Sequence, residues 1–176
     1  MSYEMGEHSY GFITSNGDGA IIVGKFCSIS NEVQAEFFPD HRVDWISTYP
    51  FSAVELLTYT GETWPTAEGL KGHPKHNSNK VVIGNDVWIG QKVIFLADAE
   101  VGDGAVIGMH SVVAGKIPPY SVAVGNPARP VKKRFSDAII EKLLEIKWWD
   151  WPKEKIDKFV PLLYSDNVEE FVAAVG

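Results

Sequence analysis

Cysteine is almost absent from this chain of 176 residues, since Cys27 is the only one. A single thiol excludes an intrachain disulfide framework, the usual support of small secreted domains. Long apolar runs are absent too, and no segment has the roughly 20 consecutive apolar residues of a membrane-spanning helix. The amino-terminal stretch also lacks the charged and then apolar pattern of a secretory leader. We therefore expect a cytoplasmic protein that does not insert into a membrane.

Positive charge is scarce as well. Lysine and arginine together number 16 against 23 acidic residues, which leaves a formal net charge of −7. This surplus repels nucleic acid phosphates, so we expect no nucleic-acid partner. The histidine, cysteine and acidic residues show no metal-ligand spacing, and we predict no bound metal. A hydrophobic content of 45% is enough for one sizeable core.

Helical periodicity is absent between Ile83 and Ile117, where the sequence repeats every six residues instead. Each repeat opens with an apolar residue, and its fifth residue is small or β-branched. The opening residues are Ile83, Ile89, Phe95, Val101, Ile107 and Val113. The fifth residues are Val87, Val93, Ala99, Ala105, Ser111 and Ile117. The same phase appears earlier at Val23 and Ile29, and a weaker version that includes Met5 predicts one degraded coil at the amino terminus.

These hexapeptides predict short strands joined by turns, three to a triangular coil. The opening apolar side chains then point inward and pack against those of the coils above and below. A doubly wound α/β sheet would need helices between its strands, and the repeats contain no helical pattern. We therefore predict a mainly β fold, a parallel β-helix built from hexapeptide repeats.

Two segments break the period. Residues from about 37 to 80 carry no repeat and are predicted to form a long inserted loop, which in a monotonous scaffold is typical of a functional segment. After residue 130 the spacing of apolar residues becomes helical. We divide the chain into a β-helix domain at residues 1–130, which carries the inserted loop, and a helical extension at residues 131–176.

Capping residues mark the helices of that extension. Ser136 is the predicted N-cap of a first helix, Pro152 is predicted to start a second, and Asp166 or Asn167 a short third. Trp148, Trp149 and Trp151 lie between the first two. We expect these tryptophans to anchor the extension on the β-helix, although stacking on a sugar or a cofactor is the alternative.

Five short motifs carry a resemblance to a known family. They are GKFCSI at 24–29, DHRVDWISTYPF at 40–51, IGNDVWIG at 83–90, GNPAR at 125–129 and KWWDWP at 147–152. With them the chain resembles the hexapeptide-repeat acyltransferases, and among these the xenobiotic acetyltransferases that modify streptogramins and chloramphenicol. The resemblance implies a left-handed β-helix and a homotrimer with active sites at the subunit interfaces. It also implies acetyl transfer from acetyl-CoA to a hydroxyl group of a small acceptor, an antibiotic or a sugar-like molecule.

The resemblance further assigns the general base to the histidine of the inserted segment, which is His41. A neutral imidazole accepts a proton from a hydroxyl group, and such a base typically contributes about 10²–10⁴ in rate. Without the resemblance, a surface histidine paired with a neighbouring acid is the simpler interpretation. We expect acceptor contacts from the first coil and the inserted segment, at Tyr10, Asp44 and Tyr49. Transfer is expected to be direct, because Cys27 occupies a fifth position where a small buried residue is needed.

The cofactor predictions follow from the shape and charge of CoA. Its pantetheine arm lies against backbone, which favours small residues at coil edges such as Gly108 and Ser111. Lys116 and Arg129 are predicted to meet its phosphates, although the basic stretch to which they belong has a solubilising role as its alternative. Trp88 is predicted to contact the cofactor or the neighbouring subunit, or alternatively to be an outward aromatic residue under the inserted loop.

Two other classes compete with the enzyme. A non-catalytic trimeric β-helix scaffold would keep the coils and lose the base, and the His41 motif with the GNPAR turn argues against it. A β-helix carbonic anhydrase would need several zinc-binding histidines, whereas His110 alone lies in the strong repeats and is expected to face outward.

Overall fold

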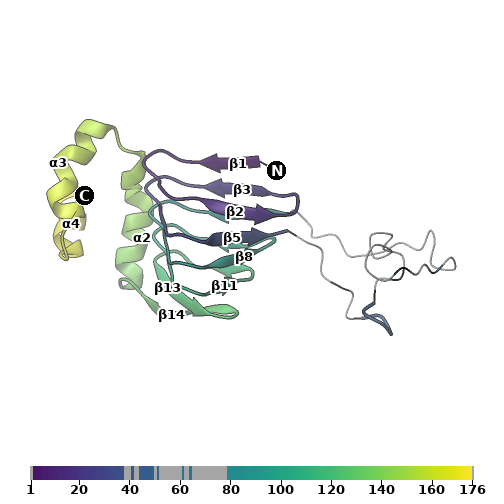
Figure 1. Cartoon of the computed structure of the whole chain (residues 1–176). Coiled ribbons are helices and arrows are strands. Elements are labelled where there is room, and N and C mark those ends of the chain that lie inside the picture. The colour runs from purple at the N-terminus through teal and green to yellow at the C-terminus, as the bar shows by residue number, and fades with distance from the viewer. Residues whose placement is uncertain are drawn as a thin grey trace. The chain divides into compact units, whose positions relative to one another are not determined.

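The computed structural model describes residues 2–37, 41, 44–49, 51, 61, 64 and 79–175. The chain forms two compact units, one of residues 1–37 and 78–176 and the other of residues 38–77. The first unit is a stack of short strands with helices along one side (Figure 1).

Three sheets make up the stack. Sheet A contains, in spatial order, β1 (Ser2–Met5), β3 (Ala20–Val23), β6 (Lys80–Ile83), β9 (Glu100–Val101) and β12 (Lys116–Ile117). Sheet B contains β4 (Ser28–Ile29), β7 (Trp88–Ile89), β10 (Val106–Ile107), β13 (Ser121–Gly125) and β14 (Ala128–Lys133). Sheet C contains β2 (Ile13–Asn16), β5 (Val33–Glu36), β8 (Ile94–Leu96) and β11 (Val112–Val113). The chain visits the three sheets in turn and all pairs are parallel except β13 with β14, which is the topology of a three-sided parallel β-helix.

The repeat sets the register and the core. Ile89 pairs with Ile107 and Ile83 with Val101, so equivalent positions of successive coils lie side by side. Every opening residue from 83 to 113 and every fifth residue from 87 to 117 is at most 4% exposed. Burial of one such aliphatic side chain stabilises the fold by about 1.5–3 kcal/mol. The prediction of stacked hexapeptide coils is confirmed.

The amino-terminal coil is confirmed too. β1 pairs with β3, Tyr10 pairs with Ser28, and β2 pairs with β5. Met5 is 42% exposed, although its place in the repeat is an opening position, because β1 is the edge strand of sheet A and has a neighbour on one side only. The stack is continuous on either side of the second unit, since Val23 pairs directly with Ile83.

Helices follow the last strand. They are α2 (Asp137–Ile146), the 3-10 turn η3 (Trp148–Asp150), α3 (Lys153–Leu163) and α4 (Val168–Val175). Ser136 and Pro152 occupy the N-cap positions of α2 and α3, as predicted. Asn167 caps α4 reciprocally with Glu170: the Glu170 N–H donates to Asn167 Oδ1 at 3.1 Å, and Asn167 Nδ2 donates to Glu170 Oε2 at 2.9 Å. β14 runs past residue 130 and ends at Lys133.

The tryptophan run fixes the helices to the stack. Trp149 is 3% exposed in a second apolar core, and the Trp148 ring lies 4.7 Å from that of Phe26 on a coil turn. An ion pair of 3.0 Å joins Lys25 to Asp150 beside them. In Figure 1, α2 runs along the strand ends, with α3 and α4 on its outer side. The predicted anchoring role is confirmed.

Candidate active site

The His41 ring is held by a backbone carbonyl. Its Nδ1 lies 2.6 Å from the backbone oxygen of Thr48. Because a carbonyl oxygen only accepts hydrogen bonds, Nδ1 carries the proton and donates it, and in the neutral ring Nε2 carries the lone pair. The Thr48 carbonyl thus helps to orient the imidazole.

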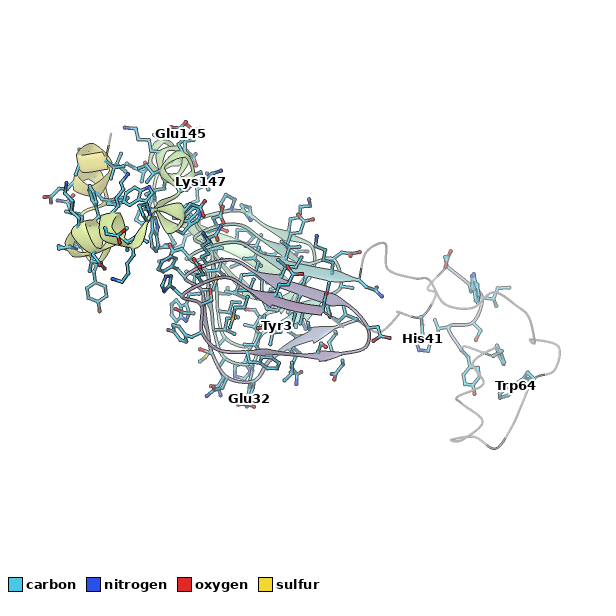
Figure 2. All side chains as sticks on the ribbon, turned by 90° about the horizontal axis from the view of Figure 1, so that it is seen from above. Tyr3, Glu32, His41, Trp64, Glu145 and Lys147 are labelled. Carbon is cyan, nitrogen blue, oxygen red and sulfur yellow. The ribbon has the colours of Figure 1, made fainter. Side chains whose placement is uncertain are left out.

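The segment around His41 is organised by local contacts. The Tyr49 ring lies 4.8 Å from Phe51 and 5.4 Å from Trp64, and these last two rings are 5.3 Å apart. The Tyr49 N–H donates to Ser47 Oγ at 3.1 Å. Figure 2 labels His41 and Trp64 in this unit. The predicted acceptor residue Asp44 is exposed here.

On the β-helix, the structure brings Tyr10 and Trp88 together. Both line a depression of about 430 Å³ over sheet B. Trp88 is 57% exposed and Tyr10 is 64% exposed, so their rings are available to a ligand or a partner surface. Asn31 and Gln91 add amide groups to the same depression. These two residues were not predicted from the sequence, although both occupy the third position of a repeat, where the side chain points outward.

Gly108 and Ser111 shape the turn of the GNPAR motif. A Cβ on Gly108 would lie 2.7 Å from Val124 Cγ1, so the glycine leaves room for the Val124 side chain of β13. Ser111 is fully buried, and its Oγ accepts a hydrogen bond of 3.0 Å from the Gly125 N–H. Gly125 begins the motif and has φ of 100°. The Ser111 side chain therefore faces the core, and only its backbone contributes to the coil edge.

The two cations predicted to meet CoA phosphates lie on different sheets. Lys116 is on β12 of sheet A, where its Nζ lies 2.8 Å from Glu100 Oε2. Arg129 is on β14 of sheet B, exposed, and donates from Nη1 to the Ala128 oxygen at 3.0 Å. Within one chain the two side chains therefore start from different faces of the β-helix.

Cys27 is buried as predicted. Its Sγ lies 3.1 Å from the Gly84 carbonyl oxygen, and burial raises the pKa of its thiol. Both features oppose a role as nucleophile. His110 is exposed, also as predicted.

In the part of the chain that the structure describes, no three histidine, cysteine or acidic side chains gather as metal ligands would. None of the helices in this part has the length and apolar character needed to cross a membrane.

Known proteins match both the repeats and the whole chain. Residues 80–115 match the family model "Bacterial transferase hexapeptide (six repeats)". A probable macrolide acetyltransferase of Lysinibacillus sphaericus is 43% identical over 97% of this chain and 89% of its own length. A chloramphenicol acetyltransferase of Agrobacterium fabrum is 39% identical over 89% of this chain and 72% of its own. Among solved structures, a hexapeptide-repeat acetyltransferase of Vibrio cholerae complexed with acetyl coenzyme A superposes with a TM-score of 0.54 at 20% identity, over 77% of this chain and 62% of that one.

These matches place the protein in the class of hexapeptide-repeat transferases. The chain belongs to the hexapeptide-repeat acetyltransferases, in the xenobiotic group that includes the macrolide and chloramphenicol acetyltransferases.

Proposed function

We propose that this protein transfers the acetyl group of acetyl-CoA directly to a hydroxyl group of a small acceptor, with His41 as the general base. The observation that carries the proposal is the Nδ1–H···O hydrogen bond from His41 to Thr48. It leaves Nε2 to receive the proton, and the carbonyl dipole stabilises the imidazolium that forms.

The acetyl group passes from CoA to the acceptor without a covalent enzyme intermediate. His41 Nε2 takes the acceptor proton as the hydroxyl oxygen bonds to the thioester carbon. Collapse of the tetrahedral intermediate breaks the carbon–sulfur bond, and the imidazolium returns its proton to the CoA thiolate. Asp44, Tyr49 and Tyr10 contact the acceptor. The acceptor class is an antibiotic of the kind named for the relatives, or a sugar-like molecule.

The active unit in this proposal is a homotrimer of left-handed β-helices in the cytoplasm. Lys116 and Arg129 lie on different sheets, and in the proposed trimer neighbouring subunits supply them to one CoA. Trp88 and the coil edge at Gly108 and Ser111 flank the pantetheine arm. In this proposal the chain has two parts. They are a β-helix domain at 1–130, with an inserted loop at about 37–80, and a helical extension at 131–176.

A thiol-release assay with acetyl-CoA tests the reaction on chloramphenicol, a macrolide, a streptogramin and amino or neutral sugars. With the best acceptor, we expect His41→Ala to lower kcat by about 10²–10⁴ and to leave acetyl-CoA affinity unchanged, because a general base acts in the transition state. His110→Ala is the matched control and should retain full activity. Near-normal turnover of His41→Ala would contradict the mechanism.

A further inference from the structure

One corner of the β-helix carries a column of turn residues with left-handed backbone. His8, Phe26, Asp86, Gly104 and Tyr120 have φ between 49° and 67°. From Phe26 onward, each donates its N–H to the preceding turn at 2.7–3.1 Å. The five positions therefore lie one above another in successive coils.

The middle of this column lacks aromatic rings. His8 stacks on Phe26 at 4.6 Å, but the next position is the carboxylate Asp86 and the one after it is Gly104. A Cβ on Gly104 would lie 2.4 Å from the Tyr120 ring, so the glycine makes room for the Tyr120 side chain. The column is thus aromatic at both ends and open between them.

The helical extension covers the column without filling it. Trp148 packs on Phe26, and Arg134 Nη1 donates to the Gly104 oxygen at 2.6 Å. Between them remains a cavity of about 170 Å³. None of the residues predicted to bind acetyl-CoA or the acceptor lines it.

The cavity has a mixed lining, with apolar side chains from the helices, Ser165 and Asp166 between α3 and α4, and a polar end at the coils. Leu143, Leu163, Val168 and Phe171 from the helices form part of the wall, and Asp86 and Tyr120 from the coils form the polar end. Tyr120 is 2% exposed, and among the described residues its hydroxyl has no hydrogen-bond partner. An unpaired buried hydroxyl costs about 1–3 kcal/mol. Asp86 Oδ2 has a long contact of 3.5 Å with Arg134.

We propose that this corner cavity is a second binding site, for a small aromatic alcohol of the size of phenol. An apolar cavity of about 150 Å³ holds benzene, so the volume fits one six-membered ring. A hydroxyl group both accepts and donates, and it therefore pairs with the Tyr120 hydroxyl and the Asp86 carboxylate at once. Asp86 and Asp166 would attract an ammonium group and the Arg134 guanidinium would repel it, so an amine of the same size is the competing ligand in the test.

Phenol, toluene and benzylamine are matched probes, because they share the ring and differ in the polar group. Binding to the full chain is measured by calorimetry and by the indole N–H resonance of Trp148, assigned with Trp148→Phe. We expect phenol to shift that resonance and to bind about fivefold or more tightly than toluene. Tyr120→Phe should remove this preference and leave toluene affinity unchanged. Leu163→Trp should abolish both, and Val168→Trp replaces it if the first variant does not fold.

Three outcomes overturn the proposal. One is no change in the Trp148 resonance at about 10 mM phenol. Another is an undiminished phenol affinity in Tyr120→Phe or in a folded cavity-filling variant. The third is tighter binding of benzylamine than of phenol. Acetyl transfer by His41 is assayed separately, so these outcomes leave the proposed function intact.

Discussion

A single carboxylate connects the stability of the coil corner to pH. Burial raises the pKa of Asp86 to about 6 from an ordinary value of 3.8; the charge and hydrogen bond of Arg134 lower it, and the charge of Asp103 adds to the rise. The folded state therefore holds this proton more tightly than the unfolded chain does. Stability from this group is fully present below about pH 4 and is lost as the pH rises through 6.

Asp86→Asn should remove that dependence. We expect the free energy of unfolding to increase by about 1 kcal/mol at pH 8 and to change little at pH 4. The gain is smaller than the full pKa shift implies, because the side chain is 30% exposed and the variant loses its contact with Arg134. Urea unfolding at both pH values measures the effect, with Glu100→Gln as an exposed control. An equal effect at the two pH values would refute the assignment.

Arg129 should contribute to CoA binding through attraction between its guanidinium and the CoA phosphates, which salt screens. We expect Arg129→Ala to weaken CoA binding about two- to fivefold at low salt, and the loss to shrink as salt increases. Lys116→Ala should behave similarly. Lys133→Ala, which removes a cation of the same basic stretch that is not assigned to CoA, is the control. Calorimetry that gives the same CoA dissociation constant for both Arg129→Ala and Lys116→Ala as for the natural chain would rule out the phosphate role.

At the scale of the element, each coil turn has its own space requirement. Gly104 and Gly115 both have positive φ, at 67° and 90°. A Cβ would collide with the Tyr120 ring at the first and meet nothing within 4 Å at the second. We expect Gly104→Ala to cost about 2–4 kcal/mol and Gly115→Ala about 1–2 kcal/mol, because only the first adds overpacking to backbone strain. Denaturant unfolding compares them, and equal losses would show that the ring contact is unimportant.

The strands were predictable because the repeat is short and local. A period of six fixes which residue faces inward, and Ile83 to Ile117 follow it without a break. Helix starts were predictable for the same reason, since Ser136 and Pro152 are local signals and occupy the N-cap positions, although neither side chain makes a capping hydrogen bond. The pairing of Val23 with Ile83 was not, because no local pattern reports which coils become neighbours when they lie so far apart in the sequence.

The candidate site was predictable by residue type but not by arrangement. Lys116 and Arg129 belong to one basic stretch in sequence, yet a coil changes direction at every corner and separates them onto two sheets. The environment of Asp86 could not be predicted from the sequence either. It depends on Tyr120 and Arg134, which reach Asp86 only when later coils and the extension are stacked in place.

At the scale of the whole molecule, exposed apolar side chains favour self-association. Tyr10, Trp88 and Met109 are 57–64% exposed. Apolar side chains that gather on a surface mark interaction sites. We expect sedimentation equilibrium to give three times the 19.5 kDa chain mass. Met109→Lys should weaken the assembly, while Tyr164→Lys, on the exposed end of α3, should not. Monomer alone at micromolar concentration for the natural chain would contradict the trimer.

The helical extension also changes how the coils come apart. In a stack where each coil touches only its neighbours, the ends fray first and unfolding spreads step by step. Here the extension contacts Phe26 in one of the first coils and Tyr120 in the last, with other coils between them. Loss of either end then releases contacts made by the other. We therefore expect the unit to melt as a single cooperative block, in which all coils open together.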